Sequence, residues 1–392
     1  MSDERIIYLD NNATTQVDPA VVDEMLPWLR DYYGNPSSAY RFGKRALQAV
    51  EVARERIAAL LGCETSEIIF TSCGSESINT AIQSAVALDP DRTHIITSGV
   101  EHSATMKLCE HLARKGYEVT WLPVDSTGRL DLEKLEKSIR PDTAIVSLLW
   151  ANNETGVLFP VERAAEICRA KKVLFHCDAV QAVGKIPLNL ADAGIHFLSV
   201  SGHKLHCPKG VGVLYVNKKV RFTPWLRGSQ ESARRGGTQN VASIVALGKA
   251  AEIAATHMAE EQTRVRAFRD RFESEILARV SGVEVNGDRE HRLPNTTNLT
   301  FSGIEAEGAL MLLDERGLCC SAGSACTSGS VHPSHVLKAM GFSNDRARAS
   351  LRFSFGRFNT DADIDAALEI VPAVIEKLRA LSPTGSGPVL VG

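Results

Sequence analysis

The sequence has little that would mark a membrane-bound, secreted or nucleic-acid-binding protein. No stretch approaches the roughly 18 consecutive apolar residues that span a bilayer, and Met1–Arg5 contains no apolar signal core. The net charge is only −3, so no excess of positive charge is available for binding phosphate backbones. We therefore expect a cytoplasmic protein that binds neither membranes nor nucleic acid.

A regular cysteine framework is also missing. The nine cysteines are an odd number, and no pair has the CxxC spacing. The odd number argues against structural disulfides, and the missing CxxC argues against a zinc ribbon or a thioredoxin-like motif. We expect reduced thiols and no resident metal, although the cluster of Cys319, Cys320 and Cys326 leaves a metal site open as an alternative.

What the sequence does contain is an alternation of short apolar runs and helical patterns between about residues 65 and 216. The intervening segments, such as 103–115 and 130–139, have helical length and mixed polarity. This rhythm predicts an α/β fold with a mostly parallel sheet wrapped by helices. The predicted strands are 68–70, 94–97, 119–122, 144–149, 173–176, 197–200 and 211–216.

The chain is long enough for two domains, because single cores stop growing at about 250 to 300 residues, and this chain has 392. A long helix over about 241–280 is followed by the shorter strand-like pieces 298–301 and 351–355. We expect a large domain over 16–260. A smaller α+β domain would combine 1–15 with 261–392 and carry a cysteine loop at about 319–333.

The most informative stretch is Ser201–Lys204, where a lysine follows a small-residue turn directly after the predicted strand 197–200. A partly desolvated lysine amine loses its proton more readily, and the neutral amine is the form that attacks an aldehyde. The position favours a lysine that holds pyridoxal phosphate. A solvated charge that closes a strand is the ordinary alternative.

Other reactive residues also follow predicted strands, where ligands bind in open α/β sheets. The turn at 71–77 opens a helix whose free N–H groups suit a phosphate, and Asp178 could keep a pyridine nitrogen protonated. Asn153 and His102 could reach or stack on a flat ring. The structural alternatives are helix caps at 71–77 and Asp178, an Asx turn at Asn153 and a packed histidine at 102.

The second predicted domain contains a run of small residues, 321–330, around Cys326. A loop with so little bulk suits a nucleophile that must reach a buried substrate, although most cysteines are inert and buried. Further on, Arg352 could hold a substrate carboxylate by a two-pronged hydrogen bond, or it could form a surface ion pair.

Taken together, these segments resemble the cysteine desulfurases, which are fold-type I pyridoxal phosphate enzymes of the class V aminotransferase group. Details at 70–74, 203–206 and 381–383 are most similar to the nitrogen-fixation (NifS) type rather than the housekeeping (IscS) type. The resemblance implies a mostly parallel seven-stranded sheet and a smaller α+β domain. The motifs that carry it, in the family's order, are Tyr8–Thr15, Tyr33–Ser38, Thr71–Ser77, Asn152–Gly156, Asp178–Gln181, Ser201–Lys204 and Ser324–Ser328.

The resemblance also implies roles for individual residues. Lys204 would hold the cofactor aldehyde, Asp178 the pyridine nitrogen and Gln181 the phenolic oxygen, while His102 would stack on the ring and act in catalysis. Asn153 would contact both cofactor and substrate. The residues implied for the phosphate are Gly74, Ser75, Ser201, Gly202, His203 and Thr238, and those implied for the substrate are Asn12, Asn35, Asn153 and Arg352. Thr238 would come from the other subunit, so a homodimer is expected.

The implied reaction converts L-cysteine to L-alanine and leaves a persulfide on Cys326. The sulfur would pass to an iron–sulfur scaffold or another acceptor protein, with nitrogenase maturation as the expected use, and Cys326 would contact a cluster at most transiently. The open alternatives are a housekeeping or tRNA-thiolation desulfurase, a selenocysteine lyase, an aminotransferase and a non-catalytic persulfide scaffold. Cys207, Ala322 and Gln239 depart from the family pattern without touching an assigned role.

Overall fold

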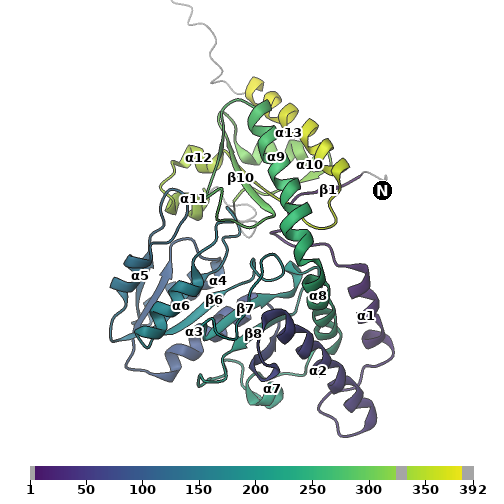
Figure 1. Ribbon diagram of the computed structural model, residues 1–392, viewed down its shortest axis with the longest axis vertical. Helices are drawn as coiled ribbons and strands as arrows, with labels where there is room; N and C mark the ends of the chain where they lie inside the picture. Colours follow the sequence, from purple (N-terminus) through teal and green to yellow (C-terminus); the bar gives the residue numbers. More distant parts are fainter. Residues whose placement is uncertain (1–4, 324–332, 382–392) are drawn as a thin grey trace, which may run out of the picture.

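The computed structural model describes residues 5–323 and 333–381. Its larger part is built on a central sheet, and helices cover both faces of that sheet (Figure 1). The smaller part lies at the end that holds the first strand and the last helix. Cys326 lies outside the described residues.

The central sheet of the described chain has seven strands and is mostly parallel, which confirms the predicted fold class. Within this sheet only β8 runs opposite to the other strands, and it pairs antiparallel with β7 and β2. Each predicted strand is present. In spatial order the strands are β2 (Ile68–Thr71), β8 (Gly212–Val216), β7 (Phe197–Ser201), β6 (Leu174–Asp178), β5 (Thr143–Leu149), β3 (His94–Ser98) and β4 (Glu118–Leu122).

Alternating strand residues supply two separate apolar layers, because successive side chains point to opposite faces of a sheet. On one face, Ile95 and Ile145 pack with residues of α3 and α4. On the other, Ile96 and Val146 belong to the core that includes α2, α6 and α8. The helices around this sheet are α1 (Pro19–Arg30), α2 (Arg41–Leu61), α3 (Gly74–Leu88), α4 (Ser103–Arg114), α5 (Leu132–Ser138), α6 (Val161–Ala170), α7 (Gln230–Ala233) and α8 (Val241–Glu260).

The predicted long helix over 241–280 is confirmed, and it joins the two parts of the molecule (Figure 1). It starts as α8 against α2, passes through the π-helical segment η3 (Glu261–Val265) and continues as α9 (Arg266–Arg279). Phe272 of α9 contacts Phe353 and Phe355 in a second apolar cluster. The helix therefore enters both cores.

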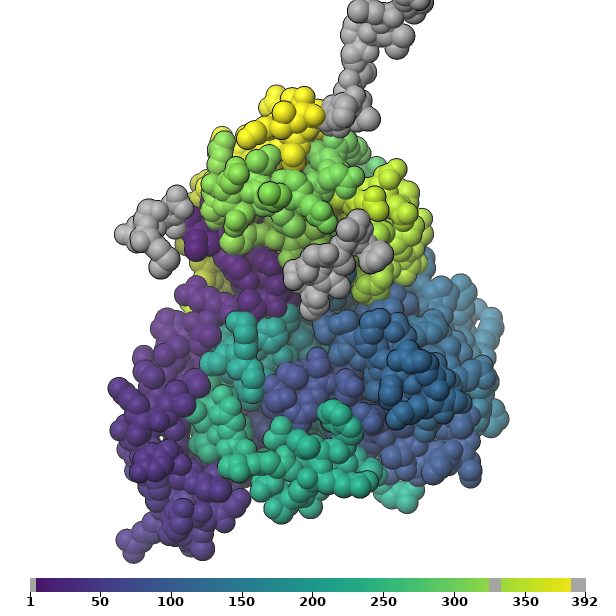
Figure 2. Space-filling view, turned by 180° about the vertical axis from the view of Figure 1, so that it is seen from behind, coloured from purple at the N-terminus to yellow at the C-terminus, as the bar shows by residue number. Residues whose placement is uncertain are grey.

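That second cluster covers an antiparallel sheet of three strands, and a two-stranded parallel pair adjoins it. The first strand of the chain takes part in this pair, so the N-terminus lies beside the C-terminal elements. Figure 2 shows the N-terminal residues running from there down one side of the larger part. The elements are β12 (Ser350–Ser354), β10 (Thr296–Phe301), β9 (Val283–Val285), β1 (Ile7–Tyr8), β11 (Leu318–Cys319), α10 (Ala306–Asp314), α11 (His335–Ala339), α12 (Asn344–Arg348) and α13 (Asp361–Leu381).

The two apolar clusters do not divide the sequence cleanly. Leu293, Val336 and Leu337 belong to the cluster of the larger part, although they lie in the segment predicted for the small domain. Within residues 5–323 and 333–381, no helix has the length and apolarity needed to cross a membrane.

The close approach of α2 and α8 gives a prediction about packing. A Cβ at Gly248 would lie 2.6 Å from both Cα and Cβ of Ala53. We expect Gly248→Ala to destabilise the protein by about 1–3 kcal/mol, since the backbone of α2 must move. The midpoint of urea unfolding measures this effect.

Gly308→Ala in α10 is the matched control. A Cβ there would meet only Leu378 Cδ2, at 3.4 Å, and alanine favours the helix by up to about 1 kcal/mol. Equal midpoints for the two variants would contradict the tight contact at Gly248.

Candidate active site

The predicted reactive residues gather at the carboxyl ends of neighbouring strands. Asp178 ends β6, Ser201 ends β7, and the 3-10 turn η2 (Gly202–Lys204) follows β7 directly. His102 lies just beyond β3, at the start of α4. Because β3, β6 and β7 run in the same direction, these residues share one edge of the sheet.

The amine of Lys204 contacts the N-terminal turn of the chain. Its Nζ donates hydrogen bonds to the backbone oxygens of Asn12, at 2.5 Å, and Ala13, at 2.6 Å. The turn is fixed to the same element, because Thr15 donates its backbone N–H and its hydroxyl to the backbone oxygen of His203. Lys204 is therefore held by residues about 190 positions away in sequence.

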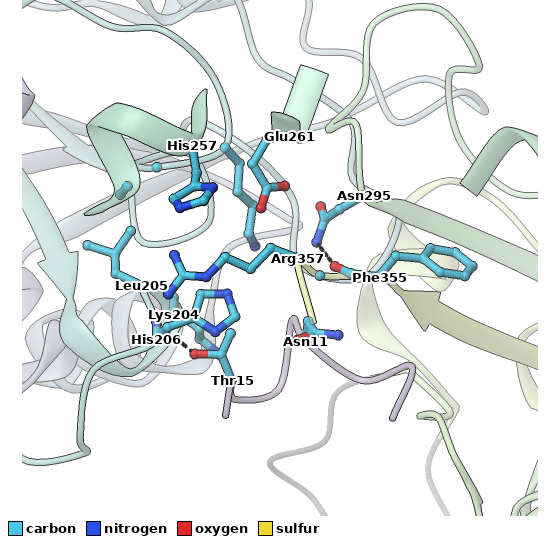
Figure 3. Close-up of a pocket in the computed structure, with 14 residues that line it drawn as sticks. Asn11, Thr15, Lys204, Leu205, His206, His257, Glu261, Asn295, Phe355 and Arg357 are labelled. Atoms are coloured by element: carbon cyan, nitrogen blue, oxygen red, sulfur yellow. Dashed lines mark hydrogen bonds between the residues drawn. The ribbon is translucent and has the colours of Figure 1, made fainter. Parts of the chain in front are cut away.

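One side of Lys204 faces a pocket between the two parts of the molecule. In Figure 3, Lys204, Thr15 and His206 lie together, while Asn295 and Phe355 approach from the smaller part. His206 donates its backbone N–H to Thr15 Oγ1, at 2.8 Å. The described lining of this pocket does not include Asp178 or His102, so the pocket lies to one side of the predicted ring site.

Asp178 is a buried carboxylate, 6% exposed. Burial raises its pKa, while His102, the N–H of Val180 and Lys204 act in the opposite direction. Val180 donates its backbone N–H to Asp178 Oδ1, at 3.0 Å. A cation such as a pyridinium beside Asp178 would offset the cost of burying its negative charge.

His102 caps α4, because its Nδ1 accepts a hydrogen bond from the backbone N–H of Ala104, at 3.1 Å. In the neutral ring the proton consequently lies on Nε2. His102 therefore has a structural role as a helix cap, which was not predicted from the sequence. The cap also fixes the ring orientation beside Asp178.

Two of the predicted phosphate residues, Gly74 and Ser201, come together at the start of α3. A Cβ on Gly74 would lie 2.9 Å from Val180 Cγ2 and 3.3 Å from Ser201 Cβ, so the missing side chain lets the helix approach the end of β7. Gly74 and Ser75 are the first two residues of α3 and contribute free backbone N–H groups there. These donors and Ser201 form a cradle that suits an anion.

The turn after β7 is packed equally closely. A Cβ on Gly202 would meet the backbone oxygen of Val211 at 3.1 Å and Cys207 Sγ at 3.2 Å. His203 Nδ1 lies 3.1 Å from Thr14 Oγ1, and burial lowers the pKa of His203 to about 4. His203 is therefore a neutral hydrogen-bonding group at pH 7.

Arg352 is buried, at 1% exposure, so the alternative of a surface ion pair is wrong. Its guanidinium donates to Asp10 Oδ1 at 2.6 Å and to the backbone oxygen of Asn153 at 3.0 Å. Asp10 also accepts from Ser321 Oγ. The pair of Arg352 and Asp10 thus joins the N-terminal turn, the strand-end loop at 153 and the segment that approaches 324.

Asn12 and Gln181 are brought into this network. Gln181 Nε2 donates to the backbone oxygen of Asn12 at 2.9 Å, and Asn12 Nδ2 donates to Thr296 Oγ1 and to the backbone oxygen of Asn153. In the described chain, the contact of Asn153 with these residues is made by its backbone rather than by its side chain.

Two predicted residues lie elsewhere in the chain. Asn35 is exposed and accepts the backbone N–H of Ser37 in a turn before α2. Thr238 lines a separate pocket with Phe70, Thr71 and Ser72. Neither residue lines the described pocket beside Lys204.

Sequence reasoning missed two buried ionisable residues, Lys185 and Glu261, which line the pocket with Lys204. The signal for Lys185 was its spacing, since it lies four residues after Gln181, on the same face of a helical turn. Glu261 gave no signal, because it lies within a long helical pattern rich in charged residues.

Comparison with known proteins identifies the family. The family model described as Aminotransferase class-V matches residues 7–367. The chain belongs to this family.

Within this class-V aminotransferase family, the similar curated proteins are cysteine desulfurases. The chain is 52% identical to a cysteine desulfurase of Nostoc sp., covering 96% of this chain and 95% of the relative. It is 51% identical to the cysteine desulfurase NifS of Azotobacter vinelandii, covering 98% and 96%. The predicted family and enzyme class are confirmed.

Solved structures of class-V relatives agree with the fold. A NifS-like protein superposes with a TM-score of 0.90 at 38% identity, covering 95% of this chain and all of the relative. A structure titled "SspA in complex with cysteine" has a TM-score of 0.80 at 35% identity, covering 90% and 99%.

Three described cysteines near the predicted site residues of this class-V protein are poor candidates for a reactive thiol. All eight described cysteines, at positions outside 324–332, are free thiols. Burial raises the pKa of Cys207, Cys319 and Cys320, which keeps them protonated. In the ranges 5–323 and 333–381 no group of three or more His, Cys, Asp or Glu side chains could hold a metal ion.

Glu101, next to His102, gives a prediction about pH. Burial raises the pKa of this fully buried carboxyl from its ordinary 4.5 to about 8. The folded chain therefore keeps a proton that the unfolded chain releases between about pH 4.5 and 8, and stability falls as pH rises through that window. Glu101→Gln removes this ionisation and keeps an acceptor for Ser98 Oγ and the N–H of Leu149.

We compare the free energies of unfolding of Glu101→Gln and the wild type. As pH rises from 6 to 8, we expect the difference to grow in favour of the variant by up to about 1.4 kcal/mol per pH unit. Urea unfolding at several pH values measures the difference, with the exposed Glu136→Gln as control. A difference that stays constant over this range would contradict the buried, protonated carboxyl.

Proposed function

We propose that the protein is a pyridoxal phosphate-dependent cysteine desulfurase that converts L-cysteine to L-alanine and stores the sulfur as a persulfide on Cys326. One arrangement carries this proposal. An amine at Lys204, a buried carboxylate at Asp178 and an anion cradle between Gly74 and Ser201 lie at one sheet edge. The chain is also about half identical to cysteine desulfurases over nearly its full length.

The residues present fit pyridoxal phosphate. The cradle of Gly74, Ser75, Ser201, Gly202 and His203 suits the phosphate, Asp178 suits the pyridine nitrogen, and Gln181 can donate to the phenolic oxygen. When bound, the cofactor supplies an electron-withdrawing ring that makes the α-proton of an amino acid acidic. Lys204 would hold the cofactor and His102 would cover its ring.

A second copy of the chain is part of this proposal. Thr238 does not line the Lys204 pocket of its own chain but a separate one, and we propose that it completes the phosphate site of a partner subunit in a homodimer. We also propose that the enzyme works in the cytoplasm.

The substrate is bound on the side of the smaller part. The guanidinium of Arg352 would hold the carboxylate of L-cysteine, taking the place that Asp10 and the backbone of Asn153 now occupy. Asn12, Asn153 and Asn35 would orient the amino acid, Asn35 from the turn before α2. The amine of Lys204 would move the proton at the α-carbon.

Cys326 would act on the substrate sulfur. Its thiolate forms an S–S bond with that sulfur while the bond from sulfur to the β-carbon breaks. The electron pair of the broken bond stays with the β-carbon, which takes up a proton and becomes the methyl group of alanine. The terminal sulfur then passes to a thiol of an acceptor protein.

We propose an iron–sulfur scaffold as the acceptor and nitrogenase maturation as the use of the sulfur. The similarity to NifS of Azotobacter vinelandii supports this assignment. A housekeeping sulfur donor or a selenocysteine lyase is an alternative.

We also propose a division into a large domain, 16–260, and a small domain, 1–15 with 261–392. The second apolar cluster supports it, because its residues all lie within 1–15 and 261–392, although Leu293, Val336 and Leu337 pack into the core of the large domain. The pocket beside Lys204 is lined from both sides of this boundary.

Cys326→Ala tests the role of the thiol. We expect it to lower alanine formation from L-cysteine at least 100-fold while the visible absorbance of bound cofactor remains, because the thiol only takes the sulfur. Alanine and sulfide are measured in parallel.

Cys319→Ala is the matched control and should keep near-normal turnover, since the pKa of this thiol is raised by burial. Full turnover by Cys326→Ala would show that another group accepts the sulfur.

A further inference from the structure

Lys185 is a buried lysine beside the cofactor lysine, and it has no place in the mechanism above. It is 6% exposed and lines the same pocket as Lys204. Burying a charged ammonium is unfavourable unless the group has a specific set of partners. Its partners therefore indicate what it does.

The fold is built to bring this side chain inward. Gly184 has a φ of +77°, which strains any other residue, and a Cβ there would lie 2.4 Å from Leu205 Cδ2 and push that side chain aside. The backbone oxygen of Lys185 accepts a hydrogen bond from Gln262 Nε2 in η3, at 2.5 Å. Lys185 is thus fixed between the end of β6 and the long helix.

The ammonium of Lys185 donates to two neutral amide oxygens. It lies 2.6 Å from Gln181 Oε1 and 3.0 Å from Asn12 Oδ1. A lysine is only a donor, so the atom of Gln181 that faces it must be the oxygen. The amide NH₂ of Gln181 consequently points the other way, where it donates to the backbone oxygen of Asn12.

That backbone oxygen of Asn12 also accepts from Lys204. Lys185 therefore fixes both the group that would donate to the cofactor and the turn that contacts the cofactor lysine. Asn12 thus links the two amines, because its side chain accepts from Lys185 and its backbone oxygen accepts from Lys204.

The surroundings of Lys185 make its ammonium easier to deprotonate. Burial and the charges of Lys204 and Arg352 lower the pKa of Lys185 to about 7, against the effect of Glu261. Burial raises the pKa of Glu261 to about 7. Other titratable groups that interact with Lys185 or Lys204 are Asp178, His203 and His206. Either form of the Lys185 amine has the two N–H groups needed to donate to Gln181 and Asn12.

We propose that Lys185 is a positioning residue of the desulfurase site, which orients the amide of Gln181 and holds the side chain of Asn12. This proposal rests on the proposed function, because it takes Lys204 as the cofactor lysine. The test must therefore include a readout that needs neither cofactor nor turnover.

The first readout is the urea unfolding of the full-length, cofactor-free chain. We expect the midpoint shifts of Lys185→Met and Gln181→Met to be non-additive in the double variant, because both substitutions remove the same contact. Lys137→Met, at a lysine whose side chain is 77% exposed, should combine additively with Gln181→Met.

The second readout is titration with pyridoxal phosphate. We expect Lys185→Met to bind it about tenfold more weakly. Lys185→Gln, whose amide can still donate to Gln181, should restore most of that affinity. Additive unfolding midpoints together with unchanged cofactor affinity of Lys185→Met would overturn the proposal. If the wild type takes up no cofactor, the proposed function fails, while the unfolding comparison still decides whether Lys185 holds Gln181.

Discussion

The site depends on the N-terminal turn at Asn12, which contacts both parts of the molecule at once. Its backbone oxygen accepts from Lys204 and Gln181, on the side of the central sheet. Its side chain bonds to Asn295 and Thr296, on the side of the smaller sheet. These contacts join segments that are up to 284 residues apart in sequence. A change at Asn12 would therefore loosen the contacts on both sides of the site.

The groups suited to the cofactor and the group suited to the substrate lie in different parts of the molecule. The edge of the central sheet provides an amine, a buried carboxylate and an anion cradle, which suit the cofactor. The smaller part provides the guanidinium of Arg352, held by Asp10, which suits a substrate carboxylate. Buried polar groups of this kind cost stability unless they are paired. Here they are paired through the N-terminal turn, which explains why the first residues of the chain return to the last strand.

The strands and the place of Lys204 in the turn after a strand could be predicted because their signals are local. A parallel strand reads as a short apolar run, and ligand residues follow such runs. The burial of Arg352 and the inward position of Lys185 could not be predicted, since each depends on residues distant in sequence. For Asn35, in contrast, the motif is recognisable in the sequence, but its place at the site does not follow from one chain, where it forms an exposed turn.

The central claim is that Lys204, rather than its buried neighbour Lys185, holds the cofactor. Loading the full-length protein with pyridoxal phosphate, reducing it with borohydride and mapping the modified peptide tests this directly. The account predicts a single stable modification on Lys204, with Lys185 unmodified. Modification of Lys185, or no stable modification of either lysine, would contradict it.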